Sequence, residues 1–186
     1  MPILLSDAVA ELSDWTLRPF KAKAGQMQVA GILGKSGSWP VVQLLPTDNM
    51  GAVTVPFPPS VYRGTGNEPR QGIMFTVPDS VLLAFAAIEE WARKQIADGV
   101  WHSAIKHSDK YPATLKAKIN VTGPNVCKIL DAKQRPTAWP DKWSHLAVMP
   151  IIEFRGVYSQ KTGSGLILEV THLMVQDTEG DAVVFI

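Results

Sequence analysis

The feature that most constrains the fold of this sequence is a pair of apolar segments within residues 151–175, IIEFRGVYSQKTGSGLILEVTHLMV. Along each segment polar and apolar side chains partly alternate, which predicts two β-strands that each have one mainly apolar face. We interpret the pair as a long β-hairpin. The connection 159–165 is longer than a two-residue turn and contains two glycines, so it predicts a mobile polar tip that carries Lys161 outward.

Upstream segments predict further strands. Segments 26–33 and 39–45 are rich in Val, Ile and Leu and flank the polar stretch 34–38, so we expect two antiparallel strands joined by a hairpin loop. Segment 52–57 predicts a short strand, which its prolines exclude from the centre of a sheet. Residues 1–24 have apolar side chains near helical spacing and predict a short helix or an ordered arm.

One helix is predicted with a complete pattern. Apolar residues in 78–98, among them Phe85 and Ile88, recur at helical spacing. Pro78 suits the first turn, and Gly99 ends the pattern. We expect the apolar stripe of this helix to pack on a sheet.

Charge is distributed unevenly along the chain, although the net charge is only +1. Residues 99–161 contain 10 Lys or Arg against 4 Asp or Glu, whereas residues 162–186 contain none against 4. A basic block followed by an acidic end is typical of a surface that binds a polyanion. A basic face that is merely solvated is the alternative.

Within the basic block, cationic and aromatic residues are interleaved. Segment 115–121 predicts a strand whose alternate residues face the core, so that Lys116 and Lys118 form an outward row, and the long polar loop beyond it contains Trp139 and Trp143. Cations contact phosphates and aromatic faces stack on exposed bases, so the pattern suits single-stranded nucleic acid. The alternative for both tryptophans is that they anchor the loop on the core. The candidate nucleic-acid-binding residues are Lys106, Lys110, Tyr111, Lys116, Lys118, Lys128, Lys133, Arg135, Trp139, Trp143, Arg155, Tyr158 and Lys161.

Catalytic and metal-binding patterns are weak. His102 and His107 lie five residues apart, a spacing that does not aim two ligands at one metal from a helix, and His145 and His172 are isolated. Cys127 has no nearby histidine in the sequence, and the glycine-rich pieces match no phosphate-binding motif. We therefore expect a binding protein with no catalytic residue, no metal and no cofactor.

Size and composition favour one domain over residues 1–186. The chain is 46% hydrophobic, and no linker or low-complexity run divides it. Its apolar runs are too short to span a bilayer, and a single cysteine fits a reducing compartment. We expect an intracellular protein that is neither secreted nor bound to a membrane.

Three pieces of the sequence resemble the single-stranded-DNA-binding proteins of large DNA viruses and some phages: KYPATLKAKINV, VCKILDAKQRPT and VMPIIEFRGVYSQKTGSGLILEVTHLMV. The resemblance covers about residues 60–178, roughly two thirds of the chain. It implies an OB-type β-barrel with an inserted helix, which coats single strands during DNA replication or recombination.

The sequence pattern and the resemblance together predict a mainly β fold with one principal helix (α+β). We expect this fold to be an OB-like small β-barrel with extensions. The expected parts are the arm or short helix at 1–24, the barrel with its inserted helix at 25–176, and an acidic and apolar end at 177–186. The expected partner is single-stranded DNA, with RNA as an alternative, and a homo-oligomer is compatible with this role. A β-rich structural or assembly protein of a virus particle is the competing function, and a small enzyme whose site joins distant residues is the third.

The C-terminal end admits two interpretations. The family has an acidic tail that recruits replication proteins, and Asp177, Glu179 and Asp181 match it in part. A mobile acidic end would also compete with DNA for a basic groove, most strongly at low salt. Residues 182–186, AVVFI, are instead typical of a strand pinned to the sheet.

Overall fold

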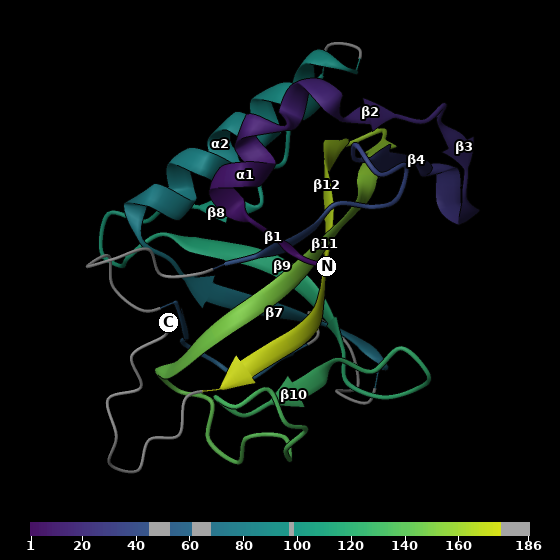
Figure 1. The fold of residues 1–186 in the computed structure, drawn as a ribbon. Helices are drawn as coiled ribbons and strands as arrows, with labels where there is room; N and C mark the ends of the chain where they lie inside the picture. Colours follow the sequence, from purple (N-terminus) through teal and green to yellow (C-terminus); the bar gives the residue numbers. More distant parts are fainter. Residues whose placement is uncertain (45–52, 61–67, 97–98, 176–186) are drawn as a thin grey trace.

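The computed structural model describes residues 1–44, 53–60, 68–96 and 99–175 (Figure 1). Two α-helices and a set of β-strands make up this part of the chain. In chain order the elements are β1 (Ile3–Leu4), α1 (Leu5–Ala10), β2 (Thr16–Leu17), β3 (Lys21–Ala22), β4 (Gln28–Leu33), β5 (Val41–Gln43), β6 (Thr54–Val55), β7 (Arg70–Thr76), α2 (Asp79–Lys94), β8 (Ile105–Lys106), β9 (Thr114–Asn120), β10 (Lys128–Leu130), β11 (Leu146–Gln160) and β12 (Gly163–Val175), with short 3-10 helices at Leu12–Asp14 and Ala24–Gln26.

The strand pairings of the described residues close into a ring. β11 pairs with β6, β6 with β7, β7 with β9, β9 with β12, and β12 again with β11. The pairing of β9 with β12 is parallel, and the others are antiparallel. Other strands extend the ring: β4 and β5 lie on β11, β10 on β12 and β8 on β9. This ring-like sheet with one principal helix confirms the predicted mainly β fold and fits an OB-like barrel with extensions.

The longest pairing joins β11 to β12 and confirms the predicted hairpin. It runs from Val148 opposite Val175 to Gln160 opposite Gly163. The register shifts between residues 151 and 152 and again between 154 and 156. Such irregularities bend a strand and increase its twist, which lets two long strands follow the curve of the ring.

The predicted long connection of this hairpin is wrong, because the turn spans only residues 161–162 and the strands pair up to Gly163. Another segment of the chain packs against the start of β12 and uses its glycines for close approach. A Cβ on Gly163 would lie 2.6 Å from His102 Nε2, and one on Gly165 would lie 2.7 Å from His102 O. Gly163 and Gly165 therefore allow the segment at His102 to pack closely against β12.

The strands predicted at 26–33 and 39–45 are present as β4 and β5, but the predicted hairpin between them is wrong. β4 pairs with β11 at residues 156–159, and β5 pairs with the same strand at residues 151–153. The two strands therefore pair with successive parts of β11, and the polar loop only connects them. Because β11 is long enough to pair with both strands, β4 and β5 pair with β11 and not with each other.

Strand β6 also corrects a prediction. It pairs with both β11 and β7, so its prolines do not keep it from an interior place in the sheet. Its two residues, Thr54 and Val55, precede the prolines at 56, 58 and 59. The strand can pair on both sides because it ends before the first residue that lacks an N–H group.

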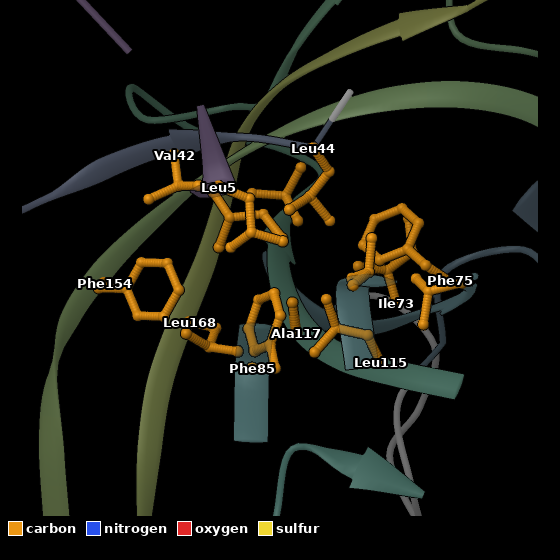
Figure 2. Packing of buried hydrophobic residues seen from close by; sticks show 14 of the residues in the cluster. Leu5, Val42, Leu44, Ile73, Phe75, Phe85, Leu115, Ala117, Phe154 and Leu168 are labelled. Atoms are coloured by element: carbon orange, nitrogen blue, oxygen red, sulfur yellow. The ribbon is translucent and has the colours of Figure 1, made fainter. Parts of the chain in front are cut away.

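Helix α2 confirms the predicted principal helix and covers one opening of the ring (Figure 1). Its Phe85 is fully buried and stacks on Phe154 of β11, with ring centroids 5.6 Å apart. Figure 2 shows this contact within the core cluster, which also contains Val42, Leu44, Ile73, Phe75, Leu115, Ala117 and Leu168. The apolar stripe of α2 therefore holds the helix against the strands.

The N-terminal segment forms the short helix α1, which packs beside α2 (Figure 1). Ala8 of α1 is fully buried. Trp15 lies edge-on to Trp91 of α2, with ring centroids 5.7 Å apart, so both tryptophans pack in the core region. Within the predicted region 1–24, the helix spans Leu5–Ala10 and the short strands β2 and β3 follow it.

Several predicted segments lie outside the described residues. They are the helix end at 97–98, residues 45 and 52 of the strands predicted at 39–45 and 52–57, and the acidic and apolar end at 177–186. Within the described ranges, no helix has the length and apolar character needed to cross a membrane.

Candidate nucleic-acid interface

Strand β9 places two lysines on the outer face of the ring. Leu115, Ala117 and Ile119 point into the core and are at most 4% exposed. The alternation of side chains along a strand therefore turns Lys116 and Lys118 outward, where both are exposed. The lysine row predicted from the sequence is present.

A groove of about 450 Å³ lies beside this row. It forms where β9 and β12 diverge, because β12 pairs with β9 only at Lys118 and Ile119, while the start of β9 pairs with β8. Its walls combine cationic, aromatic and apolar side chains, which suits an anionic ligand that has a flat apolar part. The lining residues are Met27, Arg70, His102, Ser103, Ala104, Lys116, Ala117, Lys118, Tyr158, Leu166, Ile167 and Leu168.

Three cations crowd this groove: Arg70 at the start of β7, Lys116 and Lys118. Burial, and then the positive charges of Lys116 and Arg70, lower the pKa of Lys118 below its usual value. Like charges held together destabilise the folded chain, and a bound anion relieves their repulsion. The electrostatics of the groove therefore favour a negatively charged ligand.

A nearly buried carboxylate, Glu169 on β12, organises the charges next to the groove. It is 9% exposed, and its oxygens lie 3.5 Å from Arg70 Nη2 and 3.2 Å from Arg155 Nη2. Asn120 Nδ2 donates a hydrogen bond to it at 2.9 Å. Arg155 Nε also lies 2.7 Å from Glu153 Oε2. Arg155 is thus not the free phosphate contact that the sequence predicts, because two carboxylates already engage its guanidinium.

Tyr158 is the aromatic residue that the structure brings to the groove. Its hydroxyl is hydrogen-bonded to His102 Nδ1 at 3.3 Å. Burial raises the pKa of Tyr158, so the phenol is neutral near pH 7. Gly165 lies opposite on β12, where a Cβ would come within 2.8 Å of the tyrosine oxygen, so the glycine makes room for the ring. A neutral aromatic ring among cations can stack on a nucleic-acid base.

Helix α2 holds one wall of the groove in place through Glu89, which is 8% exposed. Ser103 Oγ donates a hydrogen bond to Glu89 Oε2 at 2.7 Å, and Ala104 N donates one to Oε1 at 2.6 Å. On the other side, His102 N donates to Ser164 O at 2.7 Å. The segment 102–104 is therefore fixed between the helix and the hairpin.

We expect Glu89→Ala to lower the free energy of unfolding by about 1–3 kcal/mol, because it removes two hydrogen bonds and leaves partly buried donors without their acceptor. Urea unfolding of the purified variant measures this loss. Glu90→Ala is the matched control, since Glu90 is an exposed neighbour whose ion pair with Lys94, at 3.3 Å, contributes only about 0.5 kcal/mol. Equal losses in the two variants would contradict a positioning role for Glu89.

Lys128, Lys133 and Arg135 lie at the opposite end of β12 from the groove. β10 pairs with β12 at His172, four residues beyond the nearest groove residue of that strand, Leu168. At a rise of ~3.3 Å per residue, this separates Lys128 from the groove by roughly 13 Å. Figure 1 shows β10 and the loop that follows it far from the helices. The residues predicted as one interface therefore form two groups.

The loop after β10 uses its charges locally. Arg135 Nη2 lies 2.6 Å from Asp131 Oδ2, and the backbone N–H groups of Lys133 and Arg135 donate to Asp131 Oδ1 at 2.9 Å. Hydrogen bonds from Arg135 lower the pKa of Asp131. The charge of Arg135 is matched within its own turn.

The two tryptophans of the predicted interface pack on the protein. Trp143 is 9% exposed and belongs to the core cluster, and Trp139 is partly buried against that cluster. Their ring centroids are 5.7 Å apart. The predicted stacking role of Trp143 is corrected, because a buried ring offers no face to a base, and anchoring of the loop describes its position.

The other predicted residues are exposed but do not line the groove. Lys106 lies on β8 opposite Thr114. Lys110 and Tyr111 follow in the connection to β9, where Tyr111 is 74% exposed. Lys161 lies in the hairpin turn.

No metal site is formed by the described residues, because they contain no group of three or more His, Cys, Asp or Glu side chains able to hold a metal ion. Burial raises the pKa of Cys127 to about 12, which keeps the thiol protonated. Burial and the charge of Lys128 lower the pKa of His172. Neither residue lines the groove.

Fold and site define a class: an OB-like ring of strands with one principal helix and a cationic groove on its outer face. This is the fold of solved phage proteins that bind single-stranded DNA. The single-stranded DNA-binding protein from bacteriophage Enc34, in complex with ssDNA, aligns at a TM-score of 0.51 with 15% identity, over 90% of this chain and 99% of that protein. A C-terminal truncation of the Enc34 protein aligns at 0.52 with 16% identity, over 89% and 97%. The fold expected from the sequence resemblance is thereby confirmed, although no protein-family model and no curated protein matches the sequence.

Proposed function

We propose that this protein binds single-stranded DNA through the groove and the lysine row of β9. The observation that carries the proposal is the crowding of Arg70, Lys116 and Lys118 beside the neutral ring of Tyr158. A protein with the same fold, from bacteriophage Enc34, is solved in complex with ssDNA, which supports the proposal.

The binding mode follows from the two kinds of side chain in the groove. Phosphates of the DNA contact the cations, and the counterions of the strand are released. This release provides affinity that does not depend on the DNA sequence. Bases lie against Tyr158 and the half-buried apolar side chain of Ile167. Because every base has a π face, such stacking tolerates any sequence, and RNA is the alternative ligand.

We further propose that the protein acts in DNA replication and recombination as a viral protein that coats strands in the infected cell and carries out no reaction. Replication proteins are the proposed partners of the C-terminal end, and binding of several copies to one strand is part of the same role. The sequence resemblance to viral and phage proteins supports this part of the proposal.

The first expected result is salt-dependent binding of an oligothymidylate, measured by the change in tryptophan fluorescence or by anisotropy of a labelled strand. A protein that neutralises several phosphates loses affinity by orders of magnitude between about 50 and about 200 mM salt. An affinity that stays constant over this range would contradict phosphate contacts as the source of binding.

Gel filtration with and without the oligonucleotide separates this function from the structural one. A shift that requires the oligonucleotide supports DNA binding, whereas large assemblies without DNA would support a particle protein. A duplex of matching length is the control, because its paired bases are not available to stack on Tyr158.

A further inference from the structure

Trp39 is an exposed aromatic residue that does not line the groove. It is 43% exposed and follows the polar loop between β4 and β5. Arg155 Cζ lies over its ring, 4.1 Å from the centroid. The same guanidinium is ion-paired with Glu153 and Glu169. One face of the indole is therefore covered by a fixed cation, and its exposed surface lies on the remaining face and edges.

The indole lies on the same outer face of the sheet as the groove. Ala30 and Ile32 of β4 are 0% exposed and point into the core, so Gly31 between them faces outward. A Cβ on Gly31 would lie 3.8 Å from Trp39 Nε1, which places the edge of the indole above β4. Met27, which lines the groove, precedes Gly31 by four residues, or roughly 14 Å at ~3.4 Å per residue.

We propose that Trp39 is a second base-stacking position, which receives a base of a single strand that continues from the groove along β4. The proposal rests on the proposed function of the groove. Arg18, whose Cδ lies 3.8 Å from the same point above Gly31, provides a cation for the phosphate of that nucleotide. Trp39 and Arg18 thus offer the two contacts that a nucleotide requires, a flat aromatic face and a positive charge.

Arg155 is a positioning residue in this site. Its planar guanidinium fits the face of the indole, whereas a lysine would keep the charge but lose the flat contact with the ring. The charged network behind Arg155 therefore determines where the ring of Trp39 lies.

Photocrosslinking tests the proposal on the wild-type protein. An oligothymidylate of about 16 nucleotides, within the range of site sizes for one OB fold, carries 5-iodouracil at successive positions. We expect a covalent adduct on the tryptic peptide 36–63, located to Trp39, in addition to one on Tyr158. Arg155→Lys should reduce the yield at Trp39 more than the yield at Tyr158. Adducts that map to Tyr158 but never to Trp39 would overturn the proposal.

Affinity provides the second measurement. Trp39→Ala should weaken binding about ten-fold, which corresponds to ~1.4 kcal/mol and lies in the range for one stacked base, while Trp39→Phe should lose less. Phe57→Ala is the control, because Phe57 is 62% exposed but follows β6, which pairs with β11 at its distant end.

The outcomes separate the two proposals. If the wild type binds no oligonucleotide, the proposed function fails and the stacking position fails with it. If the wild type binds, a groove variant weakens binding and Trp39→Ala binds normally, the groove remains the site. Trp39 is then only an anchor of its loop, and the further inference is overturned.

Discussion

Charge reversal of the lysine row, Lys116→Glu combined with Lys118→Glu, is expected to lower the affinity for single-stranded DNA about 100-fold at ~0.1 M salt. Each lost phosphate contact removes about 0.9 from the slope of log affinity against log salt, so two lost contacts account for roughly 60-fold at this salt concentration. Repulsion between the new carboxylates and the phosphates adds the remainder. Fluorescence titrations at several salt concentrations measure both the affinity and the slope.

A matched control changes the net charge equally at the other end of the ring. Lys128→Glu combined with Lys133→Glu reverses two exposed lysines that lie outside the groove, beyond its end on β12. We expect a loss of less than about ten-fold, because exposed charges beyond a Debye length of ~8–10 Å are largely screened. Equal losses in the two double variants would mean that overall charge, rather than the groove, drives binding.

Gly156→Ala is expected to lower the free energy of unfolding by about 3 kcal/mol, at the upper end of the range for overpacking a tightly packed site. The new Cβ would overlap Ala30 O on the neighbouring strand β4. Ala30 is 0% exposed, and Gly156 lies opposite Gly31 in the register of the two strands. The methyl group fits only if β4 separates from β11, which breaks their pairing. Urea unfolding, followed by circular dichroism, measures the loss.

Gly31→Ala is the control for this variant, since it adds the same methyl group to the partner residue on the same pair of strands. Its Cβ would meet its nearest atoms at 3.8 Å, an ordinary contact distance. We expect a change within about 1 kcal/mol, as for other small changes in a strand. If Gly156→Ala unfolds at the same urea concentration as the wild type, the placement of β4 on β11 is wrong.

The sequence by itself determined those strands and that helix whose apolar side chains face the core on one side. Alternating side chains predicted β9, β11 and β12, and helical spacing predicted α2, because the burial of a strand face or a helix stripe leaves a period in the local sequence. The same alternation placed Lys116 and Lys118 on the outer face opposite buried Leu115 and Ala117. Such a pattern needs no knowledge of which strands pair.

Only the tertiary structure decided which charges act together. Arg70 enters the groove because β7 pairs with β9, and Lys128 lies away from it because β10 pairs with the far end of β12. Glu169 engages Arg155 across β12 and β11, so a predicted phosphate contact becomes part of an ion-paired network. These relations join residues far apart in the chain. They depend on strand pairing and register, which no local period of the sequence specifies.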